Sequence, residues 1–199
     1  MKKFCCLIMG FLATIYSIEI ENCPDPCRCS SSNLCQEIWV SCYYKGLTTI
    51  PNKYPANTCE LYLTGNDISR IEKESFSNLT KLQRLGLTDN KISSIDNRAF
   101  IGLTKLEYIS LADNDLAFID QKTFYGLRNL RFLFVDLNPF HCDCLLEGFV
   151  QYIKEFQLNS TNSIDTPKCA TPIKQTGMGL KDISPTDLSC EKSTSHTRL

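Results

Sequence analysis

The sequence predicts an α/β solenoid, a short stack of similar coils with a parallel β-sheet along one side and a disulfide-bonded cap at each end. Three observations predict this fold. A 24-residue block occurs three times without gaps, at 58–81, 82–105 and 106–129, and a fourth copy begins at 130. Cysteines cluster before and after the blocks, and a basic, then apolar, segment opens the chain. Because one coil cannot bury its own apolar side, such repeats are stable only as a stack with covered ends.

The opening segment and the cysteine content predict a secreted, extracellular protein. Lys2 and Lys3 precede an apolar stretch at 4–16, which is typical of a secretory signal peptide, and we place that peptide at 1–17. The stretch is shorter than the ~20 apolar residues that span a bilayer, and no later segment is longer, so we expect no membrane insertion. Cleavage would remove Cys5 and Cys6 and leave ten of the twelve cysteines, an even number that suits disulfides.

Composition excludes several classes of function. The net charge is −1 and no run of basic residues occurs, which argues against nucleic-acid binding. The chain has only two histidines, and the repeats contain no nucleophile–base pair, paired carboxylates or phosphate loop, so we expect neither an enzyme nor a cofactor. A zinc site is the alternative interpretation of the segment His141, Cys142, Asp143 and Cys144. Export and the even cysteine count favour disulfides there, and we expect no metal.

Within each block, aliphatic residues alternate as they do in a β-strand with one buried side. The inward-facing positions are Leu61, Leu63, Leu85, Leu87, Ile109 and Leu111. An asparagine follows each strand, where the backbone must turn, at Asn66, Asn90, Asn114 and Asn138. A phenylalanine recurs further along each block, at Phe76, Phe100 and Phe124. These three rings predict a second apolar column on the wall of the core opposite the strands.

This repeat resembles the leucine-rich repeat of extracellular proteins. The resemblance implies a short horseshoe whose parallel sheet lines the concave side, with each asparagine amide bonded to the backbone of neighbouring coils. It divides the chain into an N-terminal cap at 23–57, repeats at 58–137, a C-terminal cap at 138–190 and a polar tail at 191–199. The compact form with two caps is similar to the variable lymphocyte receptors of jawless vertebrates and related chordate receptors, although this chain shows no stalk or anchor after the second cap.

The resemblance also implies most of the disulfide pairing. In the caps of this family the matching pairs are Cys23–Cys29, Cys27–Cys42, Cys142–Cys169 and Cys144–Cys190. Cys35 and Cys59 are extra to that pattern and most simply pair with each other, although six cysteines in one cap allow many connectivities. Phe140 stands where relatives usually carry tryptophan and should still plug the end of the core. Helical spacing of Leu146, Phe149, Ile153 and Phe156 predicts a helix in the second cap.

Strand alternation also predicts which side chains face outward from the concave sheet. The predicted ligand-binding residues on this face are Tyr62, Arg84, Tyr108, Phe132, Phe134, Asp113 and Asp136. Neighbouring strands are ~4.8 Å apart, so the three rings of the later coils should form one aromatic patch. Gly86 should leave a notch beside Tyr62, and Glu60 should neutralise Arg84. The alternative is that a loop of the second cap covers these aromatic residues.

These features predict a secreted binding protein that recognises a protein or carbohydrate ligand, including a microbial surface, through its concave face. Clustered exposed aromatic residues usually mark a contact site. The resemblance favours an innate-immune or antigen-receptor-like role. The alternative is a developmental or matrix module, similar to Slit-type or small leucine-rich repeat proteins, that binds one host protein. Sequons at Asn78 and Asn159 predict glycosylation away from this face.

Overall fold

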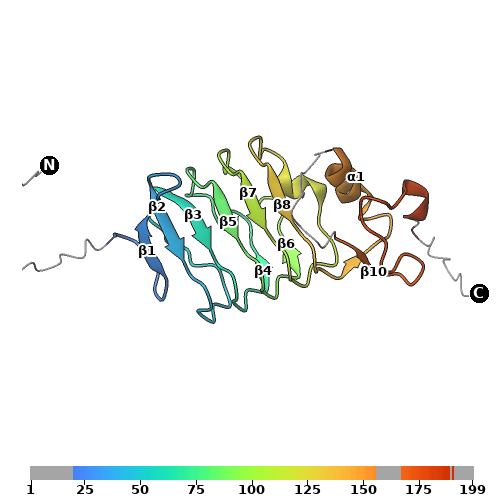
Figure 1. Ribbon diagram of the computed structural model, residues 1–199, viewed down its shortest axis with the longest axis horizontal. Helices are drawn as coiled ribbons and strands as arrows, with labels where there is room; N and C mark the ends of the chain where they lie inside the picture. The colour runs from blue at the N-terminus through green and yellow to red at the C-terminus, as the bar shows by residue number, and fades with distance from the viewer. Residues whose placement is uncertain (1–19, 156–166, 189, 191–199) are drawn as a thin grey trace, which may run out of the picture.

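The computed structural model describes residues 20–155, 167–188 and 190. One six-stranded sheet runs along the molecule in the order β1 (Arg28–Ser31), β2 (Ile38–Ser41), β3 (Thr58–Tyr62), β5 (Arg84–Gly86), β7 (Tyr108–Ser110) and β8 (Phe132–Phe134) (Figure 1). β1 and β2 form an antiparallel hairpin, and every later pair is parallel. The predicted signal peptide, Asn159 and the polar tail lie outside the described residues.

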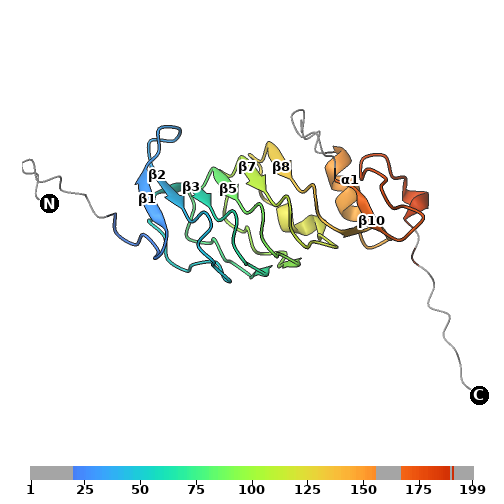
Figure 2. The same ribbon diagram turned by 60° about the horizontal axis from the view of Figure 1, so that its bottom comes forward.

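The coils return along the side opposite this sheet. Two short strands, β4 (Arg70–Ile71) and β6 (Ser94–Ile95), pair in parallel there, and the next coil carries the 3-10 turn η1 (Gln121–Phe124) just after the equivalent position. Figure 2 shows the large sheet along one side of the stack and these segments on the other. The described repeats therefore form the predicted solenoid, with short strands and turns rather than α-helices opposite the sheet.

Consecutive strands pair without any offset between coils. Leu61 lies opposite Leu85, which lies opposite Ile109, which in turn lies opposite Leu133. All four side chains are buried. A block of constant length returns the chain to the same height in every coil, so equivalent side chains form straight columns across the sheet.

The phenylalanines form the predicted second column. Their ring centroids are 5.9 Å apart between Phe76 and Phe100 and 6.2 Å apart between Phe100 and Phe124. Phe149 continues the stack at 6.0 Å from Phe124 and also contacts Phe140, which is fully buried. The aromatic column therefore runs from the first repeat into the second cap.

The asparagines form a ladder of hydrogen bonds between coils, as the resemblance implies. The Asn114 side chain is buried, and its Nδ2 donates to the carbonyl of Leu87 in the preceding coil at 2.9 Å and to that of Leu111 in its own coil at 3.1 Å. Its Oδ1 accepts from the amide of Ile92 at 3.0 Å. Asn66, Asn90 and Asn138 make equivalent bonds. Each amide thus satisfies backbone groups that the turn would otherwise bury without partners.

Both ends of the stack carry disulfides. The pairs are Cys23–Cys29, Cys27–Cys42 and Cys35–Cys59 at the first end and Cys142–Cys169 and Cys144–Cys190 at the second. In the second cap, β9 (Phe140–His141) pairs with β10 (Cys169–Thr171), followed by the short turn η2 (Pro185–Asp187). The helix α1 (Glu147–Glu155) lies between β9 and β10 in sequence and buries Phe149, Val150 and Ile153.

Candidate ligand-binding surface

The side of the six-stranded sheet that faces away from the core, called the sheet face below, carries straight columns of side chains. One column contains Glu60, Arg84, Tyr108 and Phe132, and the next contains Tyr62, Gly86, Ser110 and Phe134. The structure therefore brings the predicted residues Tyr62, Arg84, Tyr108, Phe132 and Phe134 to one face. Asp113 and Asp136 lie where the later strands end.

Three rings of the later coils form one cluster. The Tyr108 ring lies 6.4 Å from the Phe132 ring and 5.3 Å from the Phe134 ring, measured between centroids. Phe132 keeps 42% of its side-chain surface exposed, and the other two rings are half-buried. The segment 156–166 of the second cap lies outside the described residues, so availability of the whole cluster for contact stays a prediction.

The first cap supplies one further aromatic residue, Tyr43, which was not predicted from the sequence and which joins the predicted Tyr62 in a second group. β2 pairs in parallel with β3, with Val40 opposite Leu61, so the segment after β2 forms a further coil of the stack. Tyr43 thereby comes to the sheet face and stacks on Tyr62, with ring centroids 5.5 Å apart. A signal was present in the sequence, because Val40 and the fully buried Cys42 repeat the spacing of the inward leucines.

The two groups approach each other across Gly86. The predicted notch at this glycine is wrong, because a Cβ there would lie 2.8 Å from Cδ1 of Tyr62, whose ring covers the glycine. Burial raises the pKa of Tyr43, with smaller contributions from Glu60 and Tyr108. The aromatic band, which we define as Tyr43, Tyr62, Tyr108, Phe132 and Phe134, thus crosses the sheet from the first cap to the last strand.

A buried carboxylate supports the first half of the band. Glu60 is only 4% exposed and accepts a hydrogen bond from the Tyr62 hydroxyl at 2.7 Å and another from Ser32 in the β1–β2 hairpin. Burial, followed by this hydrogen bond, raises the pKa of Tyr62 far above its usual value. The expected neutralisation of Arg84 by Glu60 is therefore wrong. Arg84 instead lies over the Tyr108 ring, 5.9 Å from its centroid, as a cation–π contact.

The band is bordered where the strands end by a row of left-handed residues. Gly65, Asp89 and Asp113 have φ of 71°, 56° and 55°, a conformation that glycine and aspartate adopt more easily than most residues. Leu137 occupies the same place in the last coil with φ of 54° and is 60% exposed. Both the left-handed backbone and the exposure of an apolar side chain to water are unfavourable for leucine. We therefore include the Leu137 side chain in the candidate contact surface.

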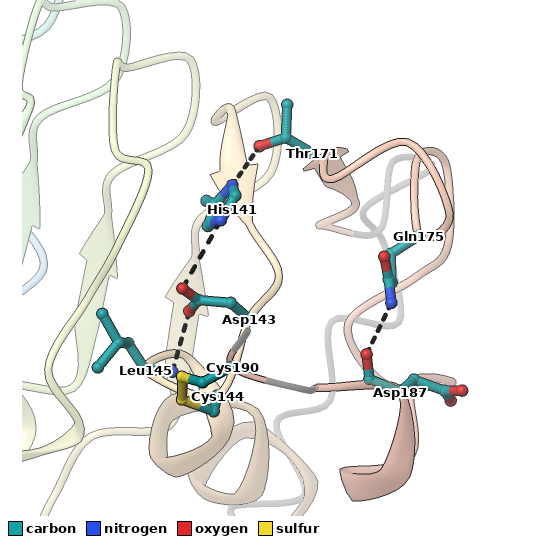
Figure 3. A network of polar contacts seen from close by, with 8 residues as sticks. All are labelled: His141, Asp143, Cys144, Leu145, Thr171, Gln175, Asp187 and Cys190. Atoms are coloured by element: carbon teal, nitrogen blue, oxygen red, sulfur yellow. Dashed lines mark hydrogen bonds and ion pairs between the residues drawn. A yellow bond between two sulfur atoms is a disulfide. The ribbon is translucent and has the colours of Figure 1, made fainter. Parts of the chain in front are cut away.

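The predicted alternative, a zinc site around His141, is not assembled as a ligand set. Cys142 and Cys144 are each bonded to another cysteine, and His141 contacts neighbours in the cap (Figure 3). Its Nδ1 lies 2.7 Å from the Thr171 hydroxyl, and its Nε2 lies 3.6 Å from Asp143. Asp143 also accepts from the Leu145 amide at 2.9 Å. These contacts join β9 to β10 and order the turn that leads to α1.

Comparison with known proteins identifies the repeats. The family profile described as leucine rich repeat matches residues 56–116 and 85–140. Residues 56–140 are leucine-rich repeats. The fold agrees, since the crystal structure of human 5T4 (Wnt-activated inhibitory factor 1, trophoblast glycoprotein) superposes with a TM-score of 0.59 and 28% identity over 68% of this chain and 49% of that one.

Curated relatives are similar to part of this chain. The insulin-like growth factor-binding protein complex acid labile subunit of Rattus norvegicus is 39% identical over 67 residues, 34% of this chain and 11% of the relative. Leucine-rich repeat-containing protein 3 of Danio rerio is 34% identical over 83 residues, 41% of this chain and 30% of the relative. The chain thus spans a tenth to a third of these relatives. Among the described residues, no helix is long and apolar enough to cross a membrane.

Proposed function

We propose that the protein is an extracellular binding module and that the aromatic band is its contact surface for a protein ligand. The observation that carries the proposal is that the rings of the band gather on one face of one sheet, in two clusters on either side of Gly86, and that Phe132 is 42% exposed at the end of the band. Exposed aromatic clusters of this kind are rare on surfaces that bind nothing and are enriched among residues that dominate binding energy. Five disulfides fit an oxidising compartment outside the cytosol.

The carboxylates where the later strands end favour a partner with basic groups at that border of the band, whereas Arg84 places a positive charge over Tyr108. Asp113 is exposed at the end of β7, and Asp136 lies near enough to contribute to the raised pKa of Tyr108, whose main cause is burial. An apolar side chain of the partner would contact Phe132 and Phe134, and a neighbouring lysine or arginine would meet the two carboxylates. Such complementarity contributes mainly to specificity and to the rate of association.

The relatives support a host protein as the ligand. One is named as a subunit of an insulin-like growth factor-binding protein complex, and another as a Wnt-activated inhibitory factor. Recognition of a microbial surface is the second candidate, because an exposed ring such as Phe132 can also stack on the apolar face of a sugar. Both candidates use the same surface and differ in the chemistry of the ligand.

The experiment compares face variants on two ligand panels. Purified protein is tested against an array of secreted proteins and receptor ectodomains and against bacterial cells and cell-wall glycans. For any ligand found, Phe132→Ala and Tyr108→Ala should each weaken binding at least roughly tenfold, since loss of a central aromatic residue often costs ~2 kcal/mol and ~1.4 kcal/mol is a factor of ten. A host-protein ligand would support the preferred candidate and a glycan ligand the second.

Lys73→Ala is the matched control. Lys73 is exposed beyond β4, on the opposite side of the stack, and lies 3.6 Å from Glu74, so its loss should leave binding unchanged. Melting temperatures of all variants should stay within a few degrees of the parent. If the face variants bind normally and Lys73→Ala or a cap variant abolishes binding, the sheet face is not the contact surface.

A further inference from the structure

A cleft of about 580 Å³ lies beside β4, between the first cap and the first repeat. Residues 48–54 form one wall and residues 69–79 the other. Phe76 and Leu79 are buried to 1% exposure beneath it, and Ile50 and Tyr54 are half-buried. The volume falls in the range of ~300–1,000 Å³ that is usual for small-molecule sites. No residue of the aromatic band lines this cleft, so the proposed function does not account for it.

Asn78 stands at the rim of the cleft and begins the sequon Asn78-Leu79-Thr80. The Leu79 amide donates to the carbonyl of Phe76 at 2.9 Å, and these two buried residues fix the turn between them. Asn78 and Thr80 are both exposed. The sequon is therefore presented on an ordered, accessible turn, with a cavity directly beside the side chain that would carry the sugar.

Apart from the exposed Lys53, the lining suits an uncharged ligand with one apolar side. The acidic groups on the β4 wall already have partners, with Glu72 3.6 Å from Arg70 and Glu74 3.7 Å from Arg98. On the other wall, the side chains of Thr48, Thr49 and Asn52 are exposed polar groups. Within the described residues, the backbone N–H groups of 48–50, 52 and 53 donate to no other backbone group, and Pro51 has none. An N-acetylglucosamine ring has an apolar face and an acetamido group with one donor and one acceptor, which matches this combination.

We propose that Asn78 is N-glycosylated and that the first N-acetylglucosamine of its glycan lies in the cleft, where it contacts the wall formed by residues 48–54. This proposal rests on the export that the proposed function assumes. The glycan attached to the first repeat at Asn78 would then contact residues 48–54 of the first cap and stabilise that loop. The equivalent positions of the next two coils are Gly102 and Gly126, so among the three repeats the sequon occurs in the coil that borders the cap and not in the other two.

The test uses the full chain secreted from eukaryotic cells, with Asn159→Gln as background so that Asn78 is the remaining sequon. Peptide mass spectrometry measures occupancy, and hydrogen–deuterium exchange follows residues 48–54. The glycosylated protein should exchange several-fold more slowly there than protein with Asn78→Gln. Protein trimmed by an endoglycosidase to a single N-acetylglucosamine should keep that protection. Thr80→Ala, which removes the glycan and keeps the asparagine, should behave like Asn78→Gln.

A relocated sequon is the control. Gly102→Asn combined with Asn78→Gln moves the attachment point one coil along, to a glycine with open space around it and φ of 86°, a left-handed conformation that asparagine adopts more easily than most residues; the melting temperature of this variant is measured alongside. Exchange in residues 48–54 should then match the unglycosylated protein. The proposal is overturned if secreted protein carries no sugar at Asn78, if glycan removal leaves exchange unchanged, or if the relocated glycan protects equally. Binding through the sheet face should be the same in all forms, so a failure here is distinguishable from a failure of the proposed function.

Discussion

Replacement of Asn114 by alanine tests whether the asparagine ladder holds the coils together. The side-chain amide makes four hydrogen bonds to backbone groups. In the alanine variant, some of these groups would keep another hydrogen-bond partner and one would not. The carbonyl of Leu87 keeps a bond from Asn90, and that of Leu111 keeps one from Asn138. The carbonyl of Ala112 keeps the amide of Asp89. Only the Ile92 amide would lose its partner, because Asn114 Oδ1 is the acceptor that the structure gives it.

The expected cost follows from that difference. One buried amide without a partner costs ~1–3 kcal/mol, and the other lost bonds add about 1 kcal/mol because their acceptors stay satisfied. Asn114→Ala should therefore lower the free energy of unfolding by about 2–4 kcal/mol, measured by guanidinium denaturation with the disulfides intact. The melting temperature should fall by roughly 4–16 °C, since ~1 kcal/mol corresponds to ~2–4 °C in a chain of this size.

Two further variants sharpen the result. Asn97→Ala makes the same change at an exposed position and should alter stability by less than ~0.5 kcal/mol. Asn114→Asp keeps an acceptor for Ile92 but buries a carboxylate beside three carbonyls, so its folded-state pKa should be raised. Its stability should increase as the pH falls through that raised pKa, because the folded form then binds the extra proton. Equal melting temperatures for Asn114→Ala and Asn97→Ala would refute the role of the ladder.

Two other substitutions test the core and the cap. Phe100→Ala removes the middle ring of the phenylalanine column and should cost ~3–5 kcal/mol by leaving a cavity, seen as a large fall in melting temperature; an unchanged value would mean that the column does not support the fold. Tyr54→Phe should stabilise the protein by about 1 kcal/mol, since the Tyr54 hydroxyl is buried without a hydrogen-bond partner and an unpaired buried group costs ~1–3 kcal/mol. A lower melting temperature for that variant would show that the hydroxyl has a partner in solution.

Features that repeat with the block could be predicted from the sequence. The inward leucines, the asparagines and the phenylalanine column follow from a constant spacing, because equal blocks place equal residues in register. Side-chain contacts between unlike residues could not be predicted. The Tyr62 ring lies over Gly86 because that glycine has no side chain to occupy the space. The Tyr43 ring stacks on Tyr62, and neither ring position follows from the repeat spacing.

The first cap was harder to interpret than the repeats. Its coil contributes Tyr43 to the sheet face, but a cysteine replaces the inward leucine at position 42, which conceals the repeat pattern. The partner of Glu60 depends on the β1–β2 hairpin, which brings Ser32 to the carboxylate although the two are 28 residues apart. No local periodicity encodes that contact, so pairing with the nearest opposite charge, Arg84, was the wrong expectation.

The strands of the repeats pair without any offset. The number of 24-residue blocks can therefore change without a change in how neighbouring strands pair. The amides of Gly65 and Asn66 bond to the next coil at Thr88 and Asp89, and those of Asp89 and Asn90 bond in the same way at Ala112 and Asp113. A duplicated or deleted block such as 82–105 would preserve these junctions and both caps. Each added block would lengthen the sheet face by ~4.8 Å. The reach of the surface toward its ligand can therefore change in whole steps, by unequal exchange of a 24-residue segment, without any new kind of backbone contact.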